Sequence, residues 1–122
     1  MRWFSETLTT LTEGVNISTG SRDFQKLDGE IYALDIDCAA DFDSGNTTDI
    51  TITIVRTGET VWSRSNSKAD AVVYPRAKVV DSANAAITNS HVPFILADDV
   101  LRVAVAQADA SKTLVVGLLL KM

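Results

Sequence analysis

Residues 49–57 read DITITIVRT, and this stretch decides the class of the fold. Isoleucine recurs at every second position, as Ile50, Ile52 and Ile54, with threonine between. Successive side chains of a β-strand point to opposite faces, so this alternation predicts a strand with a buried isoleucine face and a solvated threonine face. Branched side chains of this kind also pack well on a pleated surface. We therefore expect a strand here and a fold built largely from strands.

Upstream of this strand, EIYALDID at residues 30–37 alternates in the same way. The pattern predicts a second strand, with an inward face that carries Tyr32, Leu34 and Ile36. The segment between the two, AADFDSGNTT at residues 39–48, is rich in turn-forming residues. It predicts the loop that joins these strands.

Near the C-terminus, VLRVAVAQ at residues 100–107 and TLVVGLLLK at residues 113–121 flank a short polar turn. We expect them to form a hairpin, with Leu101 and Val103 on the same face of the first strand. A helix over residues 99–110 is the alternative, because Ala, Leu, Arg and Gln favour helices. The period of two favours the strand.

The whole chain of 122 residues has the length of one domain. A TGE turn leads from the isoleucine strand into TVWSRS at residues 60–65, which predicts a hairpin. Short strands between turns, with no helical stretches among them, predict an all-β domain: an antiparallel β-sandwich or a small, jelly-roll-like barrel. We assign residues 21–122 to this domain and expect residues 1–20, which are polar and rich in threonine, to form an N-terminal arm or the first strand.

A proline interrupts a strand signal in VVYPRAKVVDSANAAIT, at residues 72–88. Because Pro75 cannot donate a hydrogen bond to a neighbouring strand, this segment is an edge strand or a strand broken at the proline. An exposed edge invites pairing with another chain. Arg76 and Lys78 beside the proline either protect this edge or contact a partner.

The charge and the length of the apolar runs argue against two classes of partner. The net charge is −5, and binding to nucleic acid depends on Lys and Arg, so no nucleic-acid partner is expected. The most apolar run, at residues 114–120, is far shorter than the roughly 20 residues of a membrane-spanning helix. Residues 1–14 lack the apolar core of a signal peptide, so we expect neither membrane insertion nor secretion.

The loop at residues 39–48 raises the question of a calcium site, because its aspartates supply the oxygen ligands that calcium prefers. The pattern lacks the spacing and the final glutamate of an EF-hand, so a solvated turn is the preferred interpretation. The residues that would form such a site are Asp41, Asp43, Gly45, Asn46 and Asp49.

The residues needed for catalysis are scarce in this chain. His91 is the sole histidine, and no G-x-S-x-G nucleophile motif or glycine-rich phosphate loop is present. Cys38 is the sole cysteine, so no intramolecular disulfide forms, and its place at the end of an apolar strand predicts a small buried side chain. We expect neither a cofactor nor an enzymatic activity.

Residues 72–120 resemble small head proteins of tailed bacteriophages in the order and spacing of short motifs. These motifs are YPR at 74–76, V-x-D-S-x-x-A-A-I at 79–87, the Pro93–Phe94 pair, and LRVAVA at 101–106. RWFSETLTT near the N-terminus and the central GEIYALDID are similar too.

The resemblance implies a capsid decoration, or cement, protein. Such a protein is commonly a homotrimer that sits on the outer surface of the virion and bridges neighbouring major capsid proteins, after synthesis in the bacterial host cytoplasm. On this view we expect residues 1–10 to bind the capsid as an arm. The expected capsid contacts are Trp3, Phe4, Arg76 and Lys78, and the expected trimer interface is Pro93, Phe94, Leu101 and Val103.

Two alternatives remain open at this point. A carbohydrate- or receptor-binding module of a phage fibre would also be all-β and acidic. A head-completion or tail structural protein is the second alternative, distinguished by whether the chain forms rings or tubes alone.

Overall fold

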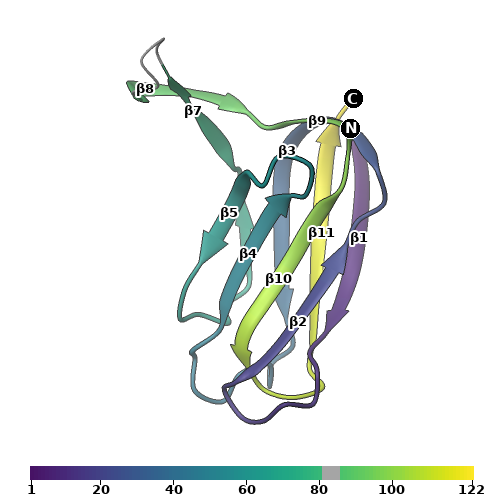
Figure 1. Ribbon diagram of the computed structural model, residues 1–122, viewed down its shortest axis with the longest axis vertical. Helices are drawn as coiled ribbons and strands as arrows, with labels where there is room; N and C mark the ends of the chain where they lie inside the picture. The colour runs from purple at the N-terminus through teal and green to yellow at the C-terminus, as the bar shows by residue number, and fades with distance from the viewer. Residues whose placement is uncertain (81–85) are drawn as a thin grey trace.

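The computed structural model describes the backbone of residues 1–80 and 86–122, and the side chains of residues 1–77 and 91–122. This part of the chain is all-β and antiparallel, as predicted, and holds eleven strands (Figure 1). It contains no helix, and so none with the length and hydrophobicity needed to cross a membrane. The strands are β1 (Arg2–Thr9), β2 (Ser18–Asp23), β3 (Leu27–Cys38), β4 (Asp49–Ile54), β5 (Thr60–Arg64), β6 (Ala71–Val73), β7 (Arg76–Val80), β8 (Ala86–Pro93), β9 (Ile95–Asp99), β10 (Leu101–Ala108) and β11 (Thr113–Lys121).

The strands form two sheets that face each other, and a separate two-stranded ribbon (Figure 1). Sheet A has the order β1-β11-β3-β6, and β9 also pairs with β3. Sheet B has the order β2-β10-β4-β5. The ribbon consists of β7 and β8, which pair only with each other among the described strands and project from the body of the molecule.

The core lies between the two sheets and is built by the alternation that the sequence displays. Ile50 and Ile52 of β4 are fully buried, and Leu101 and Val103 of β10 are buried beside them. Each such side chain contributes roughly 1.5–3 kcal/mol to the free energy of unfolding. Residues 99–110 therefore form no helix, and the predicted hairpin of β4 and β5 is confirmed.

The predicted C-terminal hairpin is wrong. β10 pairs with β2 and β4 in sheet B, whereas β11 pairs with β1 and β3 in sheet A. The turn at residues 109–112 thus carries the chain from one sheet to the other. Both strands bury one face in the same core, so their patterns look the same whether they pair or face each other.

The N-terminal residues belong to the sandwich and are not a free arm. β1 pairs with β11 along its whole length, from Arg2 opposite Leu120 to Thr9 opposite Thr113. Leu8 is buried in the core. The expectation of an extended arm at residues 1–10 is therefore wrong, and the first-strand alternative describes this segment.

One strand departs from strict alternation. Opposite β3, Leu119 pairs with Ala33 and Leu120 pairs with Ile31, which leaves Tyr32 as an extra residue. This β-bulge turns Ile31 into the core and leaves Tyr32 exposed, against the prediction that Tyr32 faces inward. Leu34, beyond the bulge, points inward as expected.

Candidate functional site

The ribbon is an insertion in the middle of an edge strand. β6 and β9 lie end to end along the same side of β3: Val73 pairs with Leu34, and Ile95 pairs with Glu30. Between these pairs the chain leaves sheet A to form the ribbon, and it returns at Phe94 (Figure 1). The departure point lies opposite the bulge at Tyr32.

Pro75 marks the place where the edge strand breaks. Strand pairing with β3 stops at Val73, and β7 begins at Arg76 with a new partner. Proline cannot donate to a ladder, so the break falls where the chain has no hydrogen bond to lose. The predicted interruption is confirmed. Pro75 itself is buried, which fixes the root of the ribbon against the sandwich.

Aromatic and cationic side chains hold the root of the ribbon. The rings of Tyr32 and Tyr74 pack edge to face, with centroids 5.6 Å apart. The guanidinium carbon of Arg76 lies 5.9 Å from the centre of the Tyr32 ring, and its Nη1 donates to the carbonyl oxygen of Pro75 at 2.7 Å. On the returning chain, Phe94 is buried in the core. The bulged Tyr32 thus serves as the packing surface for the ribbon root.

Exposed apolar side chains surround this root. Val72 and Tyr74 are each 58% exposed, and Ile95 is 63% exposed. Val92, in β8, is also exposed. They come from the segments just before and just after the ribbon, and exposed apolar side chains of this kind are typical of a surface for a partner.

The four predicted capsid contacts have different fates. Trp3 is exposed, and its indole covers Gly117 on the neighbouring strand, where a Cβ atom would collide with the ring. Phe4 is partly buried against the core, with Arg2 5.2 Å over its ring. Arg76 lies at the ribbon root, far along the sequence from Trp3. Lys78 falls in β7, and its side chain is outside the described residues.

The predicted trimer interface is largely wrong. Leu101 and Val103 are 0% and 1% exposed, and Phe94 is buried too. These side chains fill the core of a single chain, so another molecule cannot reach them without unfolding the sandwich. Pro93, at the end of β8, is partly exposed.

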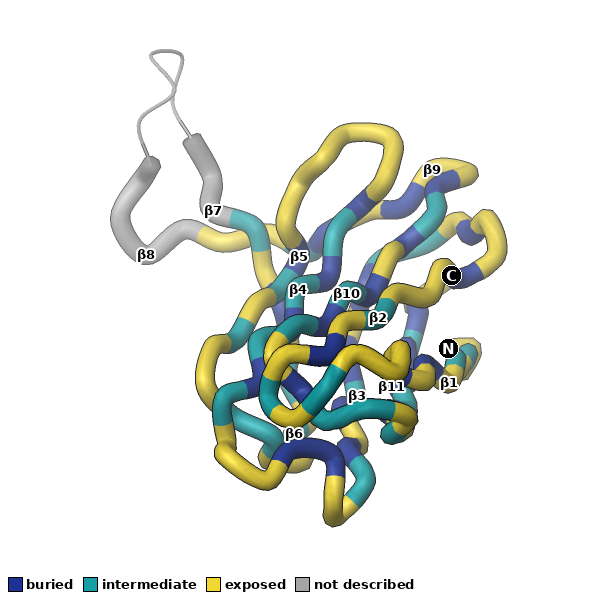
Figure 2. The backbone as a smooth tube through the Cα atoms, turned by 60° about the horizontal axis from the view of Figure 1, so that its bottom comes forward, coloured by how far each residue is buried: buried dark blue, intermediate teal, exposed yellow. Residues whose placement is uncertain are grey.

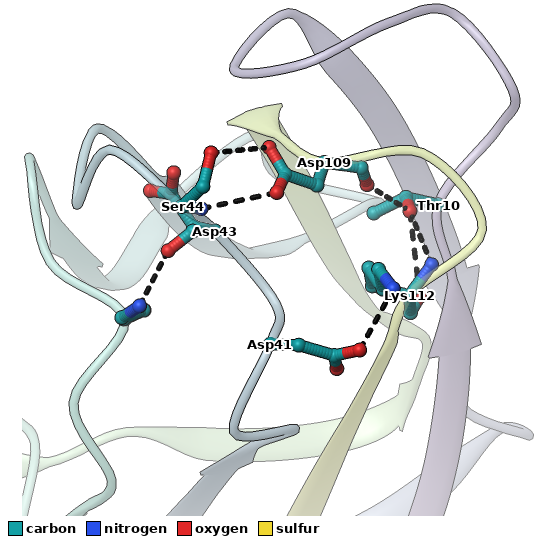
Figure 3. Close-up of polar contacts among 7 residues, drawn as sticks. Thr10, Asp41, Asp43, Ser44, Asp109 and Lys112 are labelled. Atoms are coloured by element: carbon teal, nitrogen blue, oxygen red, sulfur yellow. Dashed lines mark hydrogen bonds and ion pairs between the residues drawn. The ribbon is translucent and has the colours of Figure 1, made fainter.

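At the opposite end of the sandwich, the loop of residues 39–48 uses its aspartates internally (Figure 3). The buried Asp43 carboxylate accepts hydrogen bonds from the backbone N–H groups of Gly45 and Thr48, at 2.9 Å and 2.7 Å, and from the Thr48 hydroxyl at 2.7 Å. Burial acts to raise the pKa of Asp43, but these hydrogen bonds outweigh it, so the pKa lies below its ordinary value. The Lys68 ammonium donates to the Asp43 carbonyl at 2.5 Å.

Asp109 ties this loop to the other loops at the same end (Figure 3). Its carboxylate accepts from the backbone N–H groups of Ser44 and Asn16, both at 3.0 Å, and its carbonyl accepts from the Thr10 hydroxyl at 2.6 Å. Lys112 pairs with Asp41 nearby, at 2.7 Å. Within the described side chains, no three His, Cys, Asp or Glu residues cluster closely enough to share a metal ion.

The two side chains that could serve as a nucleophile or a base, Cys38 and His91, lie in different parts of the molecule. Cys38 is buried at the end of β3, as predicted, and this burial raises the pKa of its thiol. His91 is exposed in β8, on the ribbon, where its backbone pairs with that of Lys78.

Sequence reasoning identified Pro75 as a break but missed the surface beside it. Tyr32 was predicted to face the core, and Val72, Tyr74 and Ile95 were not predicted to form a binding surface. The proline was the available signal for this surface, because a chain whose edge strand is interrupted can leave the sheet and extend into solvent. The trace of the bulge in the sequence is Ile31, an apolar residue out of phase with Leu34 and Ile36.

No protein-family model and no curated protein matches this chain.

Proposed function

We propose that this chain is a decoration, or cement, protein of a tailed-phage capsid. It binds the outer surface of the head and bridges neighbouring major capsid proteins, as a homotrimer. The motif order within residues 72–120 supports this proposal through its resemblance to such proteins. The geometry supports only the more general statement that this protein binds other proteins.

The observation that carries the proposal is the projecting ribbon. β7 and β8 pair with each other and with no other described strand, and an isolated two-stranded hairpin is marginally stable in water. A ribbon of this kind gains stability when a partner covers it or adds a strand to its edge. The exposed apolar residues at its root, Val72, Tyr74 and Ile95, extend the same surface.

A cement protein needs several modest contacts and no single strong one. Three ribbons on one trimer would engage several shell subunits at once, and the effective concentration of the later contacts would raise the overall affinity. Because Leu101 and Val103 are core residues, the trimer contacts would come from other surfaces.

The test uses heads of the phage that encodes the chain, prepared from a strain that lacks the gene. Purified protein is mixed with these heads, which are then pelleted and analysed by quantitative gel. We expect saturable binding in a fixed ratio to the major capsid protein, and no binding to unassembled shell subunits. Absence of the protein from the pellet at micromolar concentrations contradicts the proposal.

Sedimentation equilibrium of the isolated protein tests the oligomer separately. We expect a species of three times the chain mass at micromolar concentrations. A stable monomer would remove the homotrimer from the proposal and leave the head-binding test unaffected.

A carbohydrate- or receptor-binding module is the second candidate. Trp3, Tyr32 and Tyr74 are exposed aromatic side chains, and such rings stack on sugars. Binding of the pure protein on a glycan array, without binding to heads, would favour this candidate.

A further inference from the structure

We propose that the outer face of sheet A docks an extended segment of a partner protein that is both apolar and cationic. The outer face is the side of sheet A turned away from the core. The inference deepens the proposed function, since it assigns a second contact surface, beside the ribbon, to a protein that bridges others. It rests on the side chains that β1, β3 and β11 turn outward.

The central strand of this face is apolar on both sides. Leu114, Val116, Leu118 and Leu120 of β11 fill the core and are at most 1% exposed. The residues between them, which turn outward, are Val115, Gly117 and Leu119. A sheet with one face in water normally alternates apolar and polar side chains, whereas a strand that is apolar on both faces is typical of one covered on both sides.

Trp3 continues this apolar surface onto β1. Trp3 pairs with Leu119, which in turn pairs with Ala33 of β3, so the three lie in one row across the sheet. The Trp3 ring lies over Gly117, and 55% of the side chain is still exposed. Together with Val115, these residues form an apolar lane along β11.

The outer face of sheet B has a different composition. On β4, Thr51 and Thr53 turn outward, and on β10 the outward Arg102 pairs with Asp23 at 2.8 Å. That face therefore has the polar character expected of a solvated sheet. The apolar lane is a property of sheet A alone among the two sheets described.

Two carboxylates run beside the apolar lane. Asp35 of β3 is opposite Gly117, and Asp37 is opposite Val115. Both turn away from the core, and neither takes part in an ion pair with the described side chains. Neighbouring strands are about 4.8 Å apart, so an occupant of the apolar lane lies within reach of both carboxylates.

The negative charge of Asp35 and Asp37 favours a basic partner segment over a second copy of this chain. If two copies of the chain met through this face, Asp35 and Asp37 of one copy would approach those of the other, and like charges facing each other disfavour association. A segment with apolar side chains against Val115 and Leu119 and basic side chains toward Asp35 and Asp37 complements both the apolar lane and this pair of carboxylates, which we call the acidic lane. An extended backbone repeats its side chains every second residue, and the side chains within each lane are likewise two residues apart along their strand.

The direct test titrates the full-length, isotopically labelled protein with two synthetic peptides, followed by NMR. In one six-residue peptide Lys alternates with Val, and in the other Glu replaces Lys. We expect shifts at the Trp3 indole and at the amides of Val115 and Leu119 with the Lys peptide only. Equal binding of both peptides, or shifts confined to sheet B or to the ribbon, overturns the inference.

Variants then identify the two lanes. The double variant Asp35→Asn with Asp37→Asn should weaken binding of the Lys peptide about fivefold, as exposed charge pairs contribute modestly. Trp3→Ala should weaken it at least about tenfold, since aromatic anchors dominate such surfaces. Glu59→Gln removes an exposed acid from the β4–β5 turn and is the matched control, with no expected effect. If the double variant and Glu59→Gln bind equally, the acidic lane plays no part and the inference fails.

Phage heads and a sugar probe separate this inference from the proposed function. If the wild-type protein binds heads and the Trp3 and Asp35/Asp37 variants bind equally well, the inference is wrong and the proposed function stands. If the wild-type protein does not bind heads but the Lys peptide binds at Trp3, the proposed function is wrong and the inference stands. If cellohexaose shifts the Trp3 indole while both peptides leave it unchanged, the face is a carbohydrate surface and the inference is overturned.

Discussion

Two segments leave the regular sheets of this protein, and they are stabilised in opposite ways. The loop of residues 39–48 lies at one end of the sandwich, and the ribbon of β7 and β8 projects from the other (Figure 1). The loop folds around the buried Asp43 and is joined to its neighbours by Asp109. The ribbon pairs only with itself among the described strands.

The difference separates a region whose polar groups are satisfied within the chain from a region whose apolar side chains remain available to a partner. In the loop, backbone N–H groups find acceptors within the chain, so little is left for a partner to satisfy. At the ribbon root, Val72, Tyr74 and Ile95 remain more than half exposed. Figure 2 shows buried stretches of strand inside the sandwich and half-buried or exposed chain where the ribbon begins and ends. Four predictions test this contrast, in order of their expected effect on stability.

The largest effect should come from Asp43→Ala. The substitution leaves the buried N–H and hydroxyl groups of Thr48 without their acceptor, so we expect the free energy of unfolding to fall by about 2–3 kcal/mol. Urea denaturation followed by circular dichroism measures this loss. The control is Ser44→Ala, which removes an exposed hydroxyl and should change stability by less than about 0.5 kcal/mol. Equal effects of the two variants would mean that the loop does not depend on Asp43.

Acid should have the next largest effect. The folded-state pKa of Asp43 is lower than its ordinary value, and so is that of Asp99, whose carboxylate accepts from Arg56 and from the N–H of Ala97. Such groups stabilise the fold fully above the unfolded-state pKa of about 3.9, and this stabilisation is lost as the pH falls through the lower, folded-state pKa. The melting temperature should therefore be nearly constant above about pH 5 and fall steeply below about pH 4.

The Asp43→Asn variant is the control for this pH dependence. It should show a shallower decrease in melting temperature at acid pH, because one of the carboxylates with a lowered pKa is gone. An unchanged slope would assign the acid sensitivity to other carboxylates.

A smaller effect is expected from Gly117→Ala, which tests how Trp3 is held on sheet A. The new Cβ atom would overlap the indole, so the ring must move outward. We expect a loss of about 1 kcal/mol and a change in the chemical shift of the Trp3 indole N–H. Ser5→Ala, opposite Gly117 on β1, places nothing beneath the ring and should leave that signal unchanged. A stationary indole in Gly117→Ala would show that Trp3 does not depend on this contact.

The smallest effect on stability should follow from removing the ribbon. Because β6 and β9 are two halves of one edge strand, replacing residues 75–93 by two glycines should leave a folded sandwich, with the free energy of unfolding changed by less than about 1 kcal/mol. The same variant should no longer bind phage heads. If the shortened chain fails to fold, the ribbon is part of the core and the contrast between the two segments is wrong.

Much of the core could be predicted from the sequence, whereas the candidate binding surface could not. Period-two alternation placed Ile50 and Ile52 correctly on an inward face. It failed at Tyr32, because a single extra residue in β3 puts the positions on its two sides out of phase, so that Ile31 turns inward together with Leu34. The aromatic root of the ribbon depends on that bulge, which the sequence signals only by the apolar Ile31, out of phase with Leu34 and Ile36.

The error over the trimer interface has a related cause. Leu101 and Val103 were assigned to a surface on the assumption that a domain this small leaves apolar side chains uncovered. The two sheets cover them completely. An apolar strand face shows that something buries it, but its sequence does not say whether that is the same chain or another.

By itself, the sequence determined that this protein is made of strands, which side of most strands faces the core, and that the edge strand breaks at Pro75. These are local properties, set by side-chain alternation and by the missing N–H of proline. The tertiary structure alone decided that β10 and β11 lie in opposite sheets, that Tyr32 bulges outward, and that the ribbon projects beside an apolar face. Strand partners are chosen by packing between residues far apart in the chain, and the alternating pattern is the same for every partner that buries the same face.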